Sequence, residues 1–412
     1  MIVFCGPSAQ ALDRSIFSLE NYEARAAVKE VLISSLAELE GVKPALIAQR
    51  ESALRVQFRV ESQGGFLYLL FLNESEGAFP VAGRGNIIIK RDMRDGRFVQ
   101  MKLFLRAHSE CFIRIFPAGK RSLMDVTLFG EPLYQKVLLP LEFTQLLDTP
   151  FSEIVSLTAA TVDWPLLLYE GRDEEDRRGG AIAQRIRELV PRLKALEDGA
   201  MDARGKYVLI AGGAPQGEPG GFNCSGFAKW VVDGFIIPLL GRGLEIESLK
   251  KKRTEVRGNR WNTRYEQQRD PYFGLDWSRN LAIALLEARE GRAIADPERA
   301  DVRQVQFLRY TEDVGYPLHA LELLLFLDCQ KNPGSFYLGS VNGEYGREPV
   351  LHQHFHLVVF FPYFTAGGEF KTAAFEINRE TGLESLKARF KQDYIHLVRL
   401  SCGGTFSPPA VE

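Results

Sequence analysis

The segment Gly220–Gly234 constrains the fold of this 412-residue chain more than any other stretch. It reads GGFNCSGFAKWVVDG, from a glycine-rich approach through a cysteine to a segment with one apolar face. The apolar positions recur at steps of three and four residues, as in an amphipathic helix, and include Phe227, Trp230 and Val231. Asn223 and Ser225 are residue types that favour a helix N-terminus. We therefore predict that Cys224 lies in the first turn of a helix that is buried on one side.

A cysteine in that position has a distinct chemistry. Backbone N–H groups without partners point outward from the first turn, and the helix dipole is positive there. Both stabilise a thiolate, which is the nucleophilic form of cysteine. Gly217, Gly220 and Gly221 carry no Cβ, so a substrate backbone has room to approach. The alternative is that Cys224 is an inert, small residue of an apolar core.

The run Asn223–Phe227 (NCSGF) resembles the nucleophile motif of the NlpC family of papain-like cell-wall cysteine peptidases. In that family, Asp-Cys-Ser-Gly and an aromatic or aliphatic residue open the catalytic helix. Upstream, Gly205–Val208 and Gly212–Pro215 are similar to the family's tyrosine-containing strand and paired glycines. The resemblance covers roughly residues 180 to 400. It implies a papain-like α+β domain, with helices packed on an antiparallel sheet and Cys224 as the nucleophile.

The same resemblance implies substrate contacts at three positions. Tyr207 matches the family's tyrosine near the cysteine, and Ser225 follows the nucleophile directly. Asn223 stands where the family usually has Asp, which helps to recognise a substrate amine. A neutral amide keeps hydrogen bonding but removes the charge attraction.

A cysteine nucleophile needs a base, and histidine is the usual one. Three histidines alternate in the apolar segment 351–361, at His352, His354 and His356. Residues two apart in a strand share a face, so we expect all three to line one side of a sheet. They would then ligate a metal such as zinc, or one of them would serve Cys224. Because the segment after His356 resembles the family's catalytic-histidine strand, we predict His356 as the base and His354 as the alternative.

The base needs a group that orients it. A turn at Gly367–Gly368 would fold the next strand back, and antiparallel counting brings Glu376 near Val359. A carboxylate there would hold the tautomer of His356 and stabilise its charged form. The alternative is a surface glutamate on an edge strand. This Cys-His-polar chemistry requires no cofactor and no metal.

The N-terminal part has a different pattern. We expect one helix over Asn21–Glu40, followed by short alternating segments from Ala53 to Pro140 with a hairpin signal at Asp95–Gly96. These segments predict an antiparallel sandwich or barrel. We therefore divide the chain into a noncatalytic β-rich module at residues 1–150, whose partner is unknown, and a peptidase domain at residues 151–412.

Charge and composition argue against several classes of protein and of site. The chain has 51 basic and 53 acidic residues, so its net charge gives no reason to expect nucleic-acid binding. The basic run Lys250–Arg253 is expected to be a solvated face. Because no apolar run is long enough, we expect no membrane span. The five cysteines include no Cys-x-x-Cys pair, so a structural zinc site of that kind is not expected.

The first 11 residues bear on the cellular compartment of the protein. Met1–Cys5 is apolar, and Ala9-Gln10-Ala11 fits the pattern that precedes a signal-peptide cleavage site. Our hypothesis is that residues 1–11 are the remnant of a signal peptide and that the protein is exported to the periplasm or cell envelope. The alternative is an ordinary N-terminal tail or strand.

We therefore predict a cysteine peptidase that cleaves an amide bond in a peptidoglycan stem peptide. By resemblance, this bond follows γ-D-glutamate. Two alternatives stay open at this point. The same fold can act as an amidase or acyltransferase on another substrate, or the chain can be a cell-wall-binding protein with an inactive site.

Overall fold

The computed structural model describes residues 15–50, 54–171, 173–252, 258, 260–262 and 274–411. The chain forms two compact units, Met1–Glu170 and Gly171–Glu412. The first unit thus includes two helices, α6 (Phe151–Thr158) and α7 (Trp164–Leu167), that the predicted division after residue 150 assigned to the second. The predicted signal remnant at residues 1–11 lies outside the described residues.

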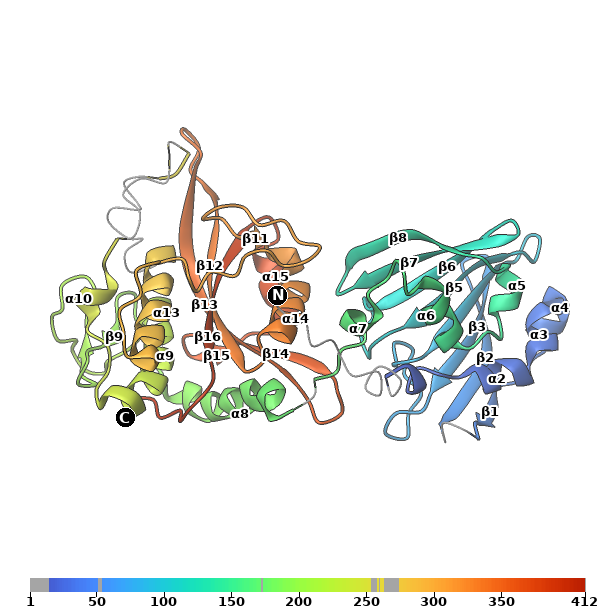
Figure 1. Cartoon of the computed structure of the whole chain (residues 1–412), viewed down its shortest axis with the longest axis horizontal. Coiled ribbons are helices and arrows are strands. Elements are labelled where there is room, and N and C mark those ends of the chain that lie inside the picture. Colours follow the sequence, from blue (N-terminus) through green and yellow to red (C-terminus); the bar gives the residue numbers. More distant parts are fainter. Residues whose placement is uncertain are drawn as a thin grey trace. The chain divides into compact units, whose positions relative to one another are not determined.

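The first unit is built on an eight-stranded antiparallel sheet in which each strand pairs with the next one in sequence (Figure 1). Its strands are β1 (Ala45–Ala48), β2 (Arg55–Gln63), β3 (Phe66–Asn73), β4 (Ile87–Asp92), β5 (Phe98–Phe104), β6 (Phe112–Ala118), β7 (Arg121–Leu128) and β8 (Glu131–Leu139). The β-rich character is as predicted, but the strands form one continuous sheet rather than the two sheets of a sandwich. Among the described residues β1 and β8 do not pair, so the sheet is also not a closed barrel.

The predicted early helix is broken into three, α2 (Tyr22–Ala27), α3 (Lys29–Ile33) and α4 (Leu36–Glu40). The break before α4 has a local cause: Ser35 and Glu38 form a capping box, in which each side chain bonds the other's backbone N–H. The buried Arg25 of α2 donates to the carbonyls of Leu147 (2.8 Å) and Thr149 (2.9 Å), on the segment between α5 (Phe143–Leu146) and α6.

The second unit contains a six-stranded antiparallel sheet in the order β11-β16-β12-β13-β14-β15. Its strands are β11 (Tyr316–Pro317), β12 (Ser335–Tyr345), β13 (Leu351–Phe364), β14 (Phe370–Glu376), β15 (Arg379–Glu380) and β16 (Tyr394–Ser401). A separate small hairpin pairs β9 (Ala200–Met201) with β10 (Tyr207–Val208). The long hairpin of β12 and β13 extends beyond the rest of this sheet (Figure 1).

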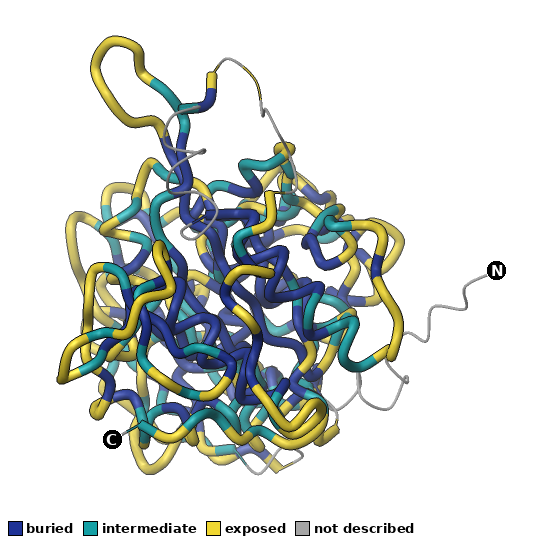
Figure 2. The backbone as a smooth tube through the Cα atoms, turned by 90° about the vertical axis from the view of Figure 1, so that its left-hand side faces the viewer, coloured by how far each residue is buried: buried dark blue, intermediate teal, exposed yellow. Residues whose placement is uncertain are grey.

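Helices cover both faces of this sheet. Helices α9 (Cys224–Leu240) and α13 (Leu275–Glu290) lie on one side, and α14 (Leu321–Lys331) and α15 (Leu383–Arg389) lie on the other (Figure 1). Helix α8 (Glu174–Leu189) joins the α9 side, because Ile186 belongs to the same buried apolar cluster as Phe227. Figure 2 shows the buried backbone running through the centre and the exposed loops around it.

Shorter elements complete the unit. They are the 3₁₀ turns Val190–Arg192 and Leu318–Ala320 and helix α10 (Ile246–Leu249). The charged residues that follow Asp173 open α8, because Asp173 caps the helix by accepting from the N–H groups of Glu175 and Asp176. Within the described part of the chain, no helix combines the length and apolar character that crossing a membrane requires.

Candidate active site

Asn223 starts helix α9 directly before the cysteine. Its Oδ1 accepts a hydrogen bond from the N–H of Gly226 at 2.7 Å, which is the bond of an N-cap residue. Its Nδ2 lies 3.4 Å from the carbonyl oxygen of Glu197, and the residue is buried. The predicted substrate contact of Asn223 therefore competes with a structural role, since both of its polar side-chain atoms face the protein.

The position after Cys224 and Ser225 has no room for a side chain, and Gly226 occupies it. A Cβ at this position would lie 1.9 Å from the carbonyl oxygen of Gly199 and 2.9 Å from the Cα of Ala200. Only glycine allows the first turn of α9 to pack so closely against the segment that leads into β9. The contact fixes where the helix begins, and with it the position of Cys224.

Cys224 reaches an open edge of strand β13. Strand β14 pairs with β13 only from Val359 to Phe364, so the first half of β13 lacks a strand partner on that side, apart from an isolated bridge between Trp261 and His352 among the described residues. The backbone N–H of Leu357 interacts with the Cys224 sulfur there. The end of β14 thus leaves room for the helix-borne cysteine to meet the strand.

A β-bulge in β13 separates the three histidines. Val341 of β12 pairs with His356, and the next residue, Asn342, pairs with His354, so Phe355 is the extra residue. Val341 and Asn342 are consecutive in β12 and therefore face opposite sides of the sheet. Their partners His356 and His354 do so as well. The expectation that His352, His354 and His356 line one face is therefore wrong.

His354 and His352 are held on the side away from His356. The ring nitrogens of His354 lie 2.8 Å from Ser340 Oγ and 3.0 Å from the carbonyl oxygen of Asp313. His352 Nε2 lies 2.5 Å from Asn342 Oδ1. The Trp261 ring contacts both imidazoles, at centroid distances of 4.6 and 5.3 Å. The alternative base His354 is thus bonded to other partners.

His356 joins Cys224 to Glu376. Its Nε2 lies 2.6 Å from Glu376 Oε1, which leaves Nδ1 as the ring nitrogen available to interact with the Cys224 sulfur. The register of the hairpin differs from the predicted one by one residue, because Val359 pairs with Phe375 rather than with Glu376. Glu376 therefore shares the face of Val358 and His356, which brings the two side chains together.

Further groups surround the carboxylate of Glu376. Thr381 Oγ1 donates to Oε2 at 2.5 Å, Arg389 donates to Oε1, and the Arg379 guanidinium lies 3.8 Å from Oε2. On the other side of the imidazole, the ring of Phe390 lies 5.9 Å from that of His356. Helix α15 and its C-cap residue Phe390 thus support His356 and Glu376 from the face opposite α9.

The ionisation states follow from these contacts. Burial favours the neutral thiol of Cys224, but hydrogen bonding and charge from His356 and the Leu357 N–H lower its pKa below the ordinary value. Burial also opposes a charged His356, yet its bonds to Cys224 and Glu376 raise its pKa to about 9. The arrangement therefore shifts the equilibrium between Cys224 and His356 toward thiolate and imidazolium.

The carboxylate of Glu376 is ionised in this arrangement. Burial opposes its charge, but the bonds from His356, Thr381 and Arg389 lower its pKa to about 2. An acceptor that stays negative over the working pH range can hold one tautomer of His356 and stabilise the imidazolium. These contacts give the site a nucleophile, a base and an orienting group.

The other predicted site residues lie differently. Ser225 is fully buried, its Oγ has no hydrogen-bond partner among the described residues, and its carbonyl accepts from Trp277 Nε1 at 3.0 Å. Tyr207 is half-buried in β10, where its ring packs against that of Phe222 with centroids 5.4 Å apart. It lines a pocket whose walls do not include Cys224. The geometry thus brings Cys224, His356 and Glu376 together, but not Tyr207.

Three groups that contact the site were not predicted from the sequence: Arg389, Thr381 and the Leu357 N–H. Thr381 follows Glu376 by five residues, across the two-residue strand β15, and this spacing was the one available signal. Arg389 is an ordinary basic residue in the last turn of α15.

Among the described residues, one group of side chains lies close enough to ligate a metal: Glu298, Glu312 and Asp313. Arg279 forms an ion pair with Asp313, and Arg303 forms one with Glu312.

Comparison with known proteins bears on the first unit. Residues 15–166 are similar to a family described as a domain of unknown function (DUF8515). This match covers the eight-stranded sheet and ends before the second unit begins. No curated protein and no solved structure matches the chain.

Proposed function

We propose that the second unit is a cysteine hydrolase of papain-like architecture that cleaves an amide bond. The observation that carries the proposal is that the His356 imidazole interacts with the Cys224 thiol while its Nε2 lies 2.6 Å from Glu376 Oε1. A cysteine at a helix start, a histidine on a later strand and a polar residue on the next strand occur in the order of the papain-like cysteine peptidases that the sequence resembles.

The proposed reaction proceeds through a thioester on Cys224. The Cys224 thiolate attacks the carbonyl carbon, and the first-turn amides of α9 at Cys224 and Ser225, which have no carbonyl partner within the helix, face the developing oxyanion. His356 gives its proton to the leaving amine, and the resulting thioester is hydrolysed by a water that His356 deprotonates. The net change is amide plus water to acid plus amine.

The proposed substrate is a peptidoglycan stem peptide, cleaved after γ-D-glutamate, in an exported protein. Support for it comes from the similarity of the NCSGF run to the cell-wall peptidase motif. The β-rich first unit is then a noncatalytic module whose partner is to be found by binding experiments.

One observation favours a second candidate, an amidase or acyltransferase that acts on a different acyl group. Asn223 carries no charge and spends its Oδ1 on capping α9. The site therefore lacks, at this position, the acid with which the NlpC family recognises a substrate amine. A transferase would use the same thioester and replace water with another acceptor.

The test compares three substrate classes with the full-length chain: purified muropeptides, acyl-lipids, and simple acyl amides with an added amine acceptor. We expect release of a new amine from muropeptides, and its loss in Cys224→Ala and in His356→Ala. Cys329→Ala is the matched control, since Cys329 is also a buried free thiol but lies on α14. Turnover that persists in Cys224→Ala would overturn the proposal. Turnover of the other two classes alone would favour the second candidate.

A further inference from the structure

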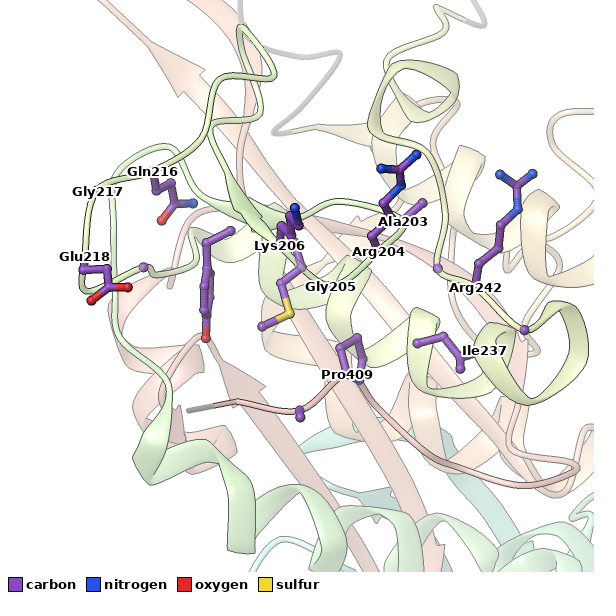
Figure 3. Close-up of a pocket in the computed structure, with 16 residues that line it drawn as sticks. Ala203, Arg204, Gly205, Lys206, Gln216, Gly217, Glu218, Ile237, Arg242 and Pro409 are labelled. Carbon is purple, nitrogen blue, oxygen red and sulfur yellow. The ribbon is translucent and has the colours of Figure 1, made fainter.

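A pocket of about 640 Å³ lies beside the β9–β10 hairpin, separate from the proposed catalytic groups. Its walls come from the hairpin turn, the loop before α9, the C-terminal end of α9 and the tail of the chain (Figure 3). The volume falls in the range of small-molecule sites.

The base of the pocket is apolar and held in place. Met201, Tyr207, Ile237 and Pro409 line it, and Figure 3 shows Ile237 and Pro409 on the same side. The position of Pro409 is fixed because its carbonyl accepts from Trp230 Nε1 at 2.9 Å. This bond holds the tail against α9, where it forms one wall of the pocket.

The loop wall is also fixed. Gln216 Nε2 donates to the carbonyls of Val208 (2.7 Å) and Gly221 (3.1 Å), and its Oε1 accepts from the Gly221 N–H at 2.8 Å. A Cβ on Gly220 would lie 2.2 Å from the Tyr207 ring, so the loop passes directly over the aromatic wall. A pocket with both walls fixed loses little conformational entropy when a ligand enters.

The rim is cationic. Arg204, Lys206 and Arg242 line it with one acid, Glu218, and Figure 3 shows the charged ends of the three cations on the same side, away from Ile237. Arg242 pairs with Glu245 at 3.2 Å. In the described part of the chain, no hydrogen bond or ion pair is found for the side chains of Arg204 and Lys206.

The turn that presents two of these cations is well defined. The Asp202 carboxylate accepts from the backbone N–H groups of Arg204 (2.8 Å) and Lys206 (2.9 Å), so its charge is engaged with the backbone. Gly205 between them has a φ of 78°, which suits glycine. Arg204 and Lys206 are thus placed side by side at the mouth of the pocket.

We propose that this pocket binds a small amphipathic anion, whose apolar body contacts Met201, Tyr207 and Ile237 and whose carboxylate or phosphate contacts Arg204 and Lys206. Planar guanidinium and ammonium donors bind such groups through charge-assisted hydrogen bonds. The chain as a whole has a net charge of −2, so this local excess of cations is not a general property of the surface. The proposal does not depend on the function of Cys224.

The test uses decanoate and decyl phosphate as probes, each below its micelle-forming concentration, and decyltrimethylammonium as the chain-matched cation. Isothermal titration calorimetry of the full-length protein should show saturable binding of at least one anion and none of the cation. The anion that binds shows whether the pocket prefers a carboxylate or a phosphate head group. Equal binding of the cation, or no binding of either anion, would overturn the proposal.

Two variants locate the site. Arg204→Gln with Lys206→Gln should weaken anion binding by about tenfold or more, because each removes a charged hydrogen-bond donor. Ile237→Glu should weaken it as well, by placing a like charge on the apolar base. The control, Lys120→Gln with Arg121→Gln, removes two exposed cations from the hairpin of β6 and β7 and should leave binding unchanged. Unchanged binding in the first variant would place the ligand elsewhere.

Discussion

Nε2 of His356 lies 2.6 Å from Oε1 of Glu376, although 20 residues separate them in sequence. The bond crosses from β13 to the last residue of β14, and the opposite ring nitrogen is left for the sulfur of Cys224. The Arg389 guanidinium bonds the same Oε1. Each of these contacts leads to a prediction that can be measured.

The first prediction concerns the reactivity of Cys224. Iodoacetamide should alkylate it at neutral pH faster than an exposed cysteine of ordinary pKa, because His356 lowers the pKa of the thiol. His356→Ala should remove this advantage. The described free cysteines Cys111, Cys329 and Cys402 are buried and serve as internal controls in the same mass spectrum. Labelling of Cys224 at or below the rate of the exposed reference would contradict a catalytic thiolate.

The second prediction concerns alkaline pH. The pKa of His356 is raised to about 9, so the imidazolium persists below that pH and is lost as the pH rises through it. Activity should fall with the same midpoint. Glu376→Gln removes a negative partner and should move the midpoint down by about one to two pH units. Glu380→Gln, which alters a partly exposed acid paired with Arg187, should not move it. An unshifted midpoint in Glu376→Gln would show that Glu376 does not act on His356.

The third prediction concerns acidic pH. Arg389 helps to keep the pKa of Glu376 at about 2, so the charge of Glu376 is lost only as the pH falls toward that value. Arg389→Met should raise the pKa of Glu376 and move the acidic limb of the Cys224 alkylation profile to higher pH. Arg389→Lys should restore part of the shift. The control is Arg379→Met, because Arg379 is exposed and 3.8 Å from Oε2. Equal profiles for the methionine and lysine variants would assign Arg389 a packing role only.

The fourth prediction concerns the start of α9. Asn223→Ala removes the cap of the Gly226 N–H and should lower the free energy of unfolding by about 1 kcal/mol. Asn223→Asp keeps an accepting oxygen and should stay close to the native value. Urea unfolding followed by the fluorescence of Trp230 and Trp277 measures both. If the alanine variant is as stable as the aspartate variant, Asn223 is free for another role, such as substrate binding.

The fifth prediction concerns a buried ion pair inside α9. Lys229 Nζ lies 2.5 Å from Asp233 Oδ2, both side chains are almost completely buried, and Asp233 Oδ1 accepts from the Leu244 N–H at 2.9 Å. Lys229→Met should cost about 3–5 kcal/mol, because it leaves a buried carboxylate unpaired. Adding Asp233→Asn should recover most of this loss, since the amide is neutral and still accepts from Leu244. Urea unfolding of the two variants checks the difference, and no recovery in the double variant would mean that packing of Lys229 dominates.

The sequence alone was enough to place Cys224 in the first turn of a helix and His356 on a strand, because capping preferences and hydrophobic periodicity are local. It was also enough to identify the N-terminal part as antiparallel β structure. Tertiary structure decided the rest. The bulge at Phe355 turns His356 away from His354, and the pairing of Val359 with Phe375 puts the next residue, Glu376, on the face of His356. Both depend on pairing between strands, and a shift of one residue moves a side chain to the other face, so no local pattern specifies them. Arg389 enters the site from α15, a helix whose own sequence gives no sign of that contact.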